Sequence, residues 1–345
     1  MRRPSEPETW SGRHDGRLAP IRKLLLTGSL VVVVLALAVV PLPLVELSPG
    51  PALDVPSQID FGGPAHPVKG RLLLTTVTLA RPSAIGALEA LLTAHHELAP
   101  EQDVIPPGVN ERDYLAAQQQ VFDESLQVAA AVGLRAAGYP VSVSGGGVEV
   151  AAVIKGSPAD GKLQVGDVIQ AVNGRPVQLA SDLQAATETA SEGQTVTLTV
   201  LRGNQQLPIQ VTLRRISQIG RPGLGVALRT MAPRITLPFP VKVRRQDIGG
   251  PSAGLMMALS VYALASGEDL THGRVVAGTG SIDVNGTVGP VGGVAEKVVG
   301  AEKQGATIFL VPTSEAADAR KGASRARVVP VDTFDQARTV LRQGP

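Results

Sequence analysis

Residues 249–267 read GGPSAGLMMALSVYALASG, the most informative stretch of the chain. The apolar run from Leu255 ends at a glycine, which predicts a buried helix that closes at Gly267. Ser252 stands at the first turn of this helix, where unpaired backbone N–H groups and the helix dipole favour negative charge. Two interpretations are open: Ser252 is a helix N-cap, or it is a nucleophile whose oxyanion these amides stabilise.

The histidines limit the choice of a general base for Ser252. Gly250–Gly254 has the Gly-x-Ser-x-Gly spacing of α/β-hydrolases, a fold that places the acid and then the histidine after the serine. Of five histidines only His272 follows Ser252, and the interval leaves no room for that order. The earlier histidines suit chymotrypsin- and subtilisin-type orders, but the local sequence matches neither family. Lysine is the next candidate base.

A helix predicted over residues 294–304 carries Lys297 at the border of its apolar stripe. At about 100° per residue, the stripe consists of Val294, Val298 and Ala301. Glu296 and Lys303 lie on the opposite face, so we expect Lys303 to be solvated. Lys297 can point into a partly desolvated site, where burial would lower its pKa toward neutrality, as a general base requires.

Three segments in the same order resemble the proteolytic domain of Lon-type serine proteases: GGPSAGL (249–255), GRVVAGTGSIDVNGTVGPVGGVAEK (273–297) and GATIFLVP (305–312). The resemblance implies a serine endopeptidase with a catalytic dyad formed by Ser252 and Lys297. It also implies that Thr279 lies near the lysine and helps to orient it.

One position departs from the family pattern. The family commonly has aspartate three residues before the serine, whereas this chain has Gly249, and Asp247 lies two positions too early. We therefore expect the electrostatics of the substrate groove to differ from those of the family.

Residues 139–215 form a stretch of short β runs, within which VAAVIKGSPADGKLQVGDVIQAVNGRPV (150–177) resembles a PDZ domain of the bacterial protease-associated type. We predict strands at 148–154 and 168–172, a helix capped by Ser181, and a hairpin across Gly203–Asn204.

The PDZ resemblance implies a binding site for peptides. Such domains accept a peptide as an extra strand and hold its C-terminal carboxylate with backbone N–H groups. The family pattern points to residues 138–141 as the carboxylate loop, although Pro140 removes one donor there.

Two segments before the PDZ piece, GRLLLTTV (70–77) and ESLQVAAAVGLRAAG (124–138), resemble the strand and helix that open the Lon proteolytic domain. The prediction is an α+β catalytic domain interrupted by an inserted, β-rich PDZ domain. Its parts are residues 48–137, the PDZ domain at 138–215, and residues 216–345. An independent N-terminal subdomain is the alternative. Helices are expected at 83–94 and 111–137, and residues 48–69 as an extended segment.

The N-terminal region predicts a membrane anchor. Residues 24–40 carry no charge and would cover roughly 26 Å as a helix, close to the thickness of a bilayer core. Basic residues precede this run, and none follows until Lys69, which places residues 1–23 in the cytoplasm. We expect a single-pass anchor at 24–44 in the cell membrane and an extracytoplasmic body. A cleaved signal peptide, with Ala36–Ala38 as its small-x-small triplet, is the alternative.

Several cofactor and partner classes are excluded. The chain has no cysteine, which removes disulfides, thiolate metal sites and cysteine nucleophiles. The P-loop-like segment 156–163 ends in Leu163, which cannot ligate Mg²⁺ as serine or threonine would. His96 lacks the second histidine of a zincin motif, because Pro100 stands four residues later. A net charge of +2 gives no case for nucleic acid. No cofactor or metal is expected.

The sequence thus predicts an ATP-independent serine endopeptidase that cleaves unfolded or flexible envelope proteins, with the PDZ domain recruiting or gating substrates. Likeness to the family suggests a homo-oligomer. The alternative from another class is a catalytically idle PDZ scaffold that assembles envelope partners. A signal-peptidase-like processing enzyme would share the Ser–Lys chemistry but lacks the matching segments.

Overall fold

The computed structural model describes residues 28–29, 32, 34–105, 109, 111–188, 190–216, 221–231, 234–244 and 248–343. The expected cytoplasmic tail lies outside these residues, as does part of the expected anchor at 24–44. Residues 34–39 are helical, and the first strand already begins at Leu44. No helix in the described part of the chain is both long and apolar enough to span a membrane.

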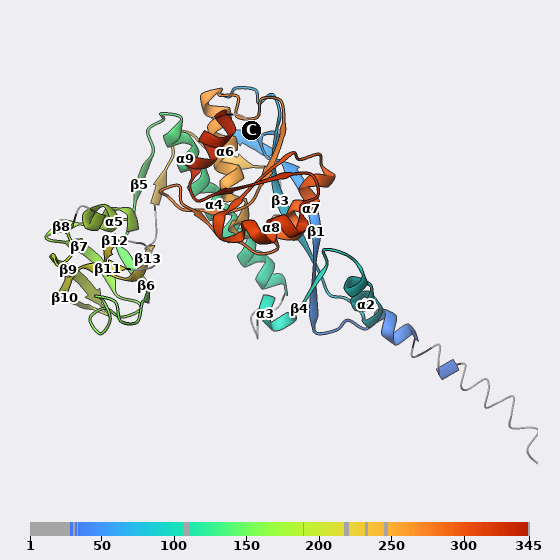
Figure 1. The fold of residues 1–345 in the computed structure, drawn as a ribbon, viewed down its shortest axis with the longest axis horizontal. Coiled ribbons are helices and arrows are strands. Elements are labelled where there is room, and N and C mark those ends of the chain that lie inside the picture. Colours follow the sequence, from blue (N-terminus) through green and yellow to red (C-terminus); the bar gives the residue numbers. More distant parts are fainter. Residues whose placement is uncertain are drawn as a thin grey trace, which may run out of the picture.

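A mixed sheet forms the centre of the larger body (Figure 1). In spatial order its described strands are β20 (Arg327–Val331), β19 (Ile308–Pro312), β16 (Val275–Gly278), β3 (Arg71–Ala80), β1 (Leu44–Asp54) and β4 (Glu97–Pro100). The first four are parallel, and β1 and β4 are antiparallel to their neighbours. Because β3 precedes the PDZ segment and β16 follows it, the sheet is assembled from both sides of that segment. The α+β fold class is confirmed.

Helices cover both faces of this sheet. Leu72 and Leu74 of β3 face a core that includes residues of α4 (Glu111–Ala136), α6 (Gly254–Ser266) and α9 (Phe334–Gln343). Leu73 faces the opposite core, built with α7 (Val294–Lys303) and α8 (Ala316–Gly322). Every residue of α6 up to Ala265 is buried, which explains its uninterrupted apolar sequence. The predicted buried helix, ending at Gly267 in the left-handed conformation, is confirmed.

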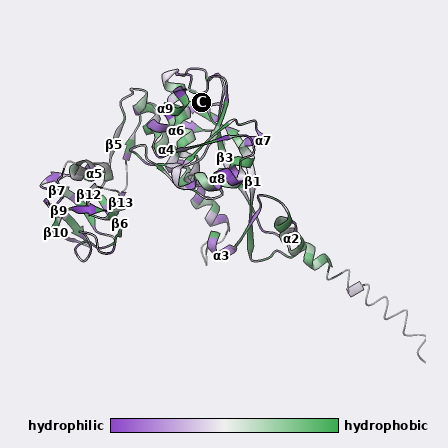
Figure 2. Ribbon diagram, viewed as in Figure 1, coloured by the Kyte–Doolittle hydropathy of each residue, from purple (hydrophilic) through white to green (hydrophobic). Residues whose placement is uncertain are grey.

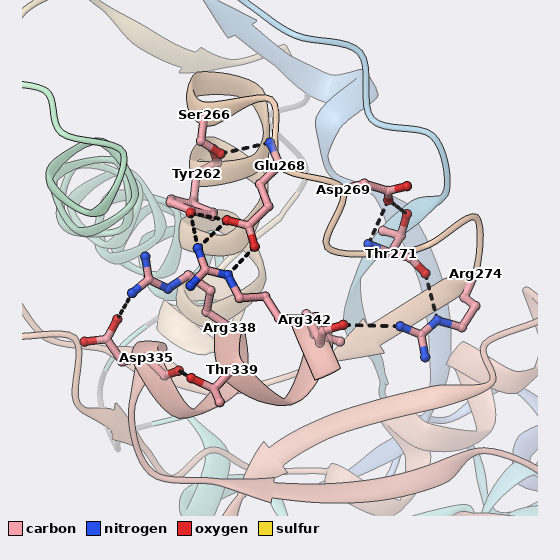
Figure 3. Close-up of polar contacts among 11 residues, drawn as sticks. Tyr262, Ser266, Glu268, Asp269, Thr271, Arg274, Asp335, Arg338, Thr339 and Arg342 are labelled. Carbon is pink, nitrogen blue, oxygen red and sulfur yellow. Dashed lines mark hydrogen bonds and ion pairs between the residues drawn. The ribbon is translucent and has the colours of Figure 1, made fainter. Parts of the chain in front are cut away.

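A cluster of polar side chains joins α9 to the C-terminal end of α6 (Figure 3). The Arg342 guanidinium pairs with the Glu268 carboxylate, which also accepts the hydroxyl proton of Tyr262. The hydrogen bonds from Arg342 hold the pKa of Glu268 below its ordinary value. Arg338 lies over the Tyr262 ring, 5.2 Å from its centroid. The cluster thereby fixes the end of α6 opposite to Ser252.

The PDZ segment forms a second sheet with its own core. Its described strands are β10 (Gln205–Thr212), β9 (Thr195–Arg202), β7 (Val168–Val172), β6 (Val148–Val153) and β13 (Val226–Thr230), with β8 (Arg175–Pro176) beside β7. The helix α5 (Ala180–Glu188) completes it. The predicted strand at 168–172 and the hairpin across Gly203–Asn204 are confirmed. The sheet continues to Thr230, beyond the expected boundary at 215.

One short ribbon links the two bodies (Figure 1), and a second ribbon belongs to the larger body. β5 (Ser142–Ser144), where the chain enters the PDZ segment, pairs with β14 (Arg234–Thr236), where it leaves. β2 (Ile59–Phe61) pairs with β15 (Val241–Val243). The entry and exit points of the inserted segment are therefore adjacent, as insertion into another domain requires.

Shorter elements complete the described chain. They are η1 (Pro56–Gln58), α2 (Ala84–Leu92), α3 (Glu101–Val104), β11 (Arg214–Ile216), β12 (Arg221–Gly223), η2 (Pro251–Ala253), β17 (Ser281–Ile282), β18 (Val288–Gly289) and η3 (Thr313–Glu315). The helix expected at 83–94 is confirmed as α2, with the Ser83 hydroxyl accepting from the Gly86 amide. The extended segment expected at 48–69 instead contains part of β1 and all of β2.

Candidate active site

Ser252 lies in η2, the single turn directly before α6, and is half-buried. The N-cap residues are Gly250 for this turn and Ala253 for α6, and the Ser252 side chain caps neither. The N-cap interpretation is therefore wrong. The backbone amide of Ser252 donates to no other group in the described part of the chain, whereas the next amides close the turn, with Gly254 donating to Pro251. The Ser252 amide, next to the serine hydroxyl, is thus available to a ligand oxygen.

Thr279 connects the two residues that the sequence singles out. It directly follows β16 and is fully buried. The Lys297 Nζ donates to Thr279 Oγ1 at 3.3 Å, and that hydroxyl donates to the Ser252 carbonyl oxygen at 3.2 Å. No hydrogen bond joins Ser252 Oγ directly to Lys297 Nζ, both of which are described. Such contacts are often long before substrate binds.

Backbone contacts hold η2 against the end of β16. The amide of Gly280 donates to the Ser252 carbonyl oxygen at 2.9 Å, and the Leu255 amide donates to the Gly280 carbonyl oxygen at 3.0 Å. Gly254 is required for this approach, because a Cβ atom there would lie 2.8 Å from the backbone nitrogen of Ile282. The spacing of glycines around the serine therefore serves close packing of the turn on the sheet.

Burial controls the acidity of Lys297. Its side chain is on α7, and the residue is only 3% exposed. Desolvation lowers its pKa to about 8, against the opposing effect of the carboxylates of Glu315 and Glu296. An amine with this pKa is partly unprotonated near neutral pH, which a general base must be. Lys303, near the end of the same helix, is exposed as expected.

Two carboxylates lie near Lys297 that the sequence pattern did not predict to be there. Both oxygens of Glu315 accept from the Val291 amide at 3.0 Å, and burial raises the pKa of this carboxyl group. Glu296, placed by periodicity on the face opposite the apolar stripe, is only 6% exposed. Helical periodicity cannot identify Glu315, because this residue lies outside α7, in the turn η3.

The four described histidines, His66, His95, His96 and His272, make no hydrogen bond to Ser252. His96 instead pairs with Glu46 at 2.5 Å. The described residues contain no cluster of histidine and carboxylate side chains suited to a metal ion. His14 and Asp247 lie outside the described residues.

The P-loop-like segment is a turn of the PDZ body. The amide of Gly156 donates to the Asp160 carboxylate at 2.7 Å, so it is already engaged. Leu163, at the position of the missing hydroxyl, is buried in the PDZ core. The segment therefore has no free cradle for a phosphate.

The PDZ sheet presents an edge strand with free amides at its start. No strand in the described chain pairs with the outer side of β13. Before this strand, Gly225 has φ 77°, and its carbonyl accepts from the Ile154 amide and the Ser157 hydroxyl. The amides of Leu224 and Gly225 donate to no described group. A loop with this geometry can bind a carboxylate.

The loop expected to bind a carboxylate, residues 138–141, lies elsewhere. Tyr139 packs edge-to-face on Phe239, 5.3 Å between ring centroids, and belongs to the core shared with α4 and α6. The resemblance placed the loop before the PDZ strands in sequence. In this chain the edge strand comes after them.

A cleft of about 710 Å³ joins the PDZ edge to the turn that carries Ser252. One wall includes Arg229, Thr230 and Met231 from the end of β13. The other includes Ser125 of α4 and Pro251, which immediately precedes Ser252. The two bodies therefore meet at a cavity beside the candidate nucleophile.

Comparison with known proteins identifies the C-terminal part of the larger body. The family model of the Lon protease (S16) C-terminal proteolytic domain matches residues 245–337. The chain contains a Lon-type proteolytic domain. Over 69 residues, 20% of this chain and 8% of the relative, it is 42% identical to Lon protease 1 of Sorangium cellulosum. Over 89 residues, 26% of this chain and 16% of the relative, it is 33% identical to Lon protease 2 of Bacillus subtilis. The chain thus spans a small part of these relatives.

The inserted segment is also identified. The PDZ domain model matches residues 133–213. A crystal structure of the PDZ domain of the SdrC-like protein from Listeria monocytogenes is 27% identical, covering 24% of this chain and 86% of that chain, with a TM-score of 0.23. The two family-model matches together place a Lon-type domain and a PDZ domain in one chain.

The environment of Lys297 predicts a pH profile. Below pH 8 the protonated amine predominates and cannot accept a proton. If Lys297 is the general base, kcat/KM for a peptide substrate should therefore rise with pH and level off above about 8. Glu315→Gln removes a charge that raises the pKa of Lys297, so the inflection should move to lower pH. Lys303→Met, an exposed change on the same helix, should leave it in place. An inflection that stays fixed or moves upward in Glu315→Gln would contradict this account.

Proposed function

We propose that this chain is a serine endopeptidase in which Ser252 is the nucleophile and Lys297 the general base. The observation that carries the proposal is the Thr279 hydroxyl, which contacts both the Lys297 amine and the Ser252 carbonyl oxygen. Burial of a charged ammonium group costs free energy, so a buried lysine near a serine turn favours a role for the neutral amine.

The chemistry follows from these positions. Ser252 Oγ attacks the scissile carbonyl carbon while neutral Lys297 accepts the hydroxyl proton. The backbone amide of Ser252 stabilises the oxyanion that forms. When the C–N bond breaks, the Lys297 ammonium donates its proton to the leaving amine. Water then attacks the acyl-enzyme while neutral Lys297 accepts its proton. The Lys297 ammonium returns this proton to Ser252 Oγ as the C–O bond of the ester breaks and the acid product leaves.

Thr279 acts as a positioning residue in this scheme. Its hydroxyl accepts from the Lys297 ammonium and has a second bond to the backbone of Ser252, so it fixes the distance between the two chain segments. Such a residue should affect the alignment of the proton transfer more than substrate binding.

Substrates are proposed to be unfolded or flexible polypeptides of the cell envelope, cut without ATP. No P-loop occurs in this sequence, so unfolding by nucleotide hydrolysis has no place in the scheme. The uncharged run at 24–40 with basic residues before it supports a single-pass anchor and an extracytoplasmic body.

The dyad is tested with the full-length protein and an unfolded, fluorescently labelled substrate in the absence of ATP. Ser252→Ala and Lys297→Met should each lower kcat by about 10³-fold or more, because the two residues act as a unit. Lys303→Met is the matched control and should retain full activity. Cleavage that persists in both dyad variants would overturn the proposal, and an inactive native chain would favour the scaffold alternative.

The PDZ domain is proposed to deliver substrate C-termini to Ser252. A peptide that pairs antiparallel with β13, its carboxylate at Leu224 and Gly225, has its upstream residues running toward Thr230. The cleft beyond Thr230 leads to Pro251. The scissile bond is thus set by its distance from the substrate's C-terminus.

Mass spectrometry of the products tests this delivery. Lengthening a flexible substrate by a Gly-Ser stretch at its C-terminus should shift the cleavage site toward the C-terminus by the same number of residues. Amidating the terminal carboxylate should lower kcat/KM by about tenfold, the loss expected when a charged hydrogen bond is removed. Unchanged cleavage sites and rates in both substrates would exclude delivery through the PDZ domain while leaving the dyad intact.

A further inference from the structure

One helix of the larger body has an apolar face that no described residue covers. On α2, Ile85, Leu88, Leu91 and Leu92 are 48%, 58%, 73% and 80% exposed. Ala87 and Ala90 form the buried side, and Glu89 is the one charged residue of the helix. Single exposed leucines are common on protein surfaces, but four large aliphatic side chains on a nine-residue helix form a contiguous apolar patch, which typically marks an interaction site.

The position of α2 points to what covers this face. Pro41 forms a β-bridge with Ser83, the N-cap of α2, and the Leu42 amide donates to the Pro82 carbonyl oxygen at 2.9 Å. The uncharged run therefore ends against the first turn of α2. The helical residues 34–39 lie beside α2 in Figure 1, and Figure 2 shows both segments coloured as hydrophobic.

We propose that the apolar face of α2 inserts into the lipid bilayer beside the anchor. This inference rests on the proposed anchoring. If residues 24–40 span the hydrocarbon core, Val40 lies at its boundary, and the bridge to Ser83 holds α2 at the same level. A helix in that interface lies with its apolar side chains toward the acyl chains. Continuity with the uncharged run favours lipid over a second copy of the chain.

The insertion gives the body a second attachment point. A single anchor lets a domain tilt freely, whereas a helix fixed at the interface restricts its orientation. Strand β1 leads from Leu44, next to the anchor, to Gly50, whose carbonyl lies against Gly300 of α7. That is roughly 20 Å of strand at about 3.3 Å per residue. The site would then be held near the membrane surface, within reach of chain segments that emerge from the bilayer.

The test uses single-cysteine variants of the full chain, which has no native cysteine. Leu88→Cys and Leu91→Cys report the apolar face, Glu89→Cys the flank of the same helix, and Leu115→Cys an exposed apolar position on α4. Each is labelled with bimane and reconstituted in phosphatidylcholine vesicles that contain nitroxide-labelled lipid. Labels at 88 and 91 should be quenched about twofold or more relative to those at 89 and 115, as expected for an interfacial helix.

The outcomes separate this inference from the anchoring on which it rests. Vesicle flotation with no excess quenching at 88 and 91 overturns the insertion of α2 and leaves the anchor intact. If the protein floats without excess quenching and these cysteines cross-link two copies, the face binds a second chain and the insertion is overturned. Failure to float overturns both. Peptide cleavage by the same samples reports the dyad separately.

A paired charge substitution adds a second readout. Leu88→Lys with Leu91→Lys should abolish quenching of a label at Ile85→Cys, because the exposed face then favours water. Both positions are exposed, so the fold should be retained, and cleavage of a short soluble peptide should be unchanged. Leu115→Lys is the control and should preserve quenching at 85. Quenching that survives the paired substitution would contradict insertion.

Discussion

The burial of one amine organises the catalytic part of this molecule. Lys297 is packed on α7 beneath the central sheet, where removal from water lowers its pKa from 10.5 to about 8. A change of this size corresponds to roughly 3 kcal/mol of disfavour for the charged form. The apolar contacts of α7 with β1, β3 and α8 must offset that cost in the folded state. The folded state is thus less stable than it would be with an apolar residue at this position, but it contains an amine that can accept a proton.

The surrounding fold places the other groups around this amine. The end of β16 carries Thr279 between Lys297 and Ser252, while the core of α6 fixes the serine turn from the other face of the sheet. The carboxylates of Glu315 and Glu296 limit how far the pKa falls. Because β3 and β16 are adjacent strands from opposite sides of the PDZ segment, the sheet that positions Thr279 contains both parts of the catalytic body.

Local sequence signals predicted much of this arrangement. The elements that were not predicted depend on contacts between residues far apart in the sequence. The helix after Ser252, the hairpin at Gly203–Asn204 and the burial of Lys297 follow from periodicity and turn residues. Strand β1 was not predicted, because Pro49, Gly50 and Pro51 in its middle are typical of turns and extended segments. There the pairing with β3 has a register shift, and a Cβ atom on Gly50 would lie 2.4 Å from Thr76 Oγ1. The PDZ edge strand was missed because its sheet partner β6 lies far earlier in the chain.

The most direct test of this account is the titration of Lys297 itself. Protein labelled with carbon-13 at lysine Cε can be followed by NMR from pH 6 to pH 11, and the Lys297→Arg variant assigns the signal. We predict a midpoint near 8 for the signal that the variant assigns to Lys297. A midpoint for Lys297 at the ordinary value of 10.5 would contradict the central claim that this fold prepares a neutral lysine for Ser252.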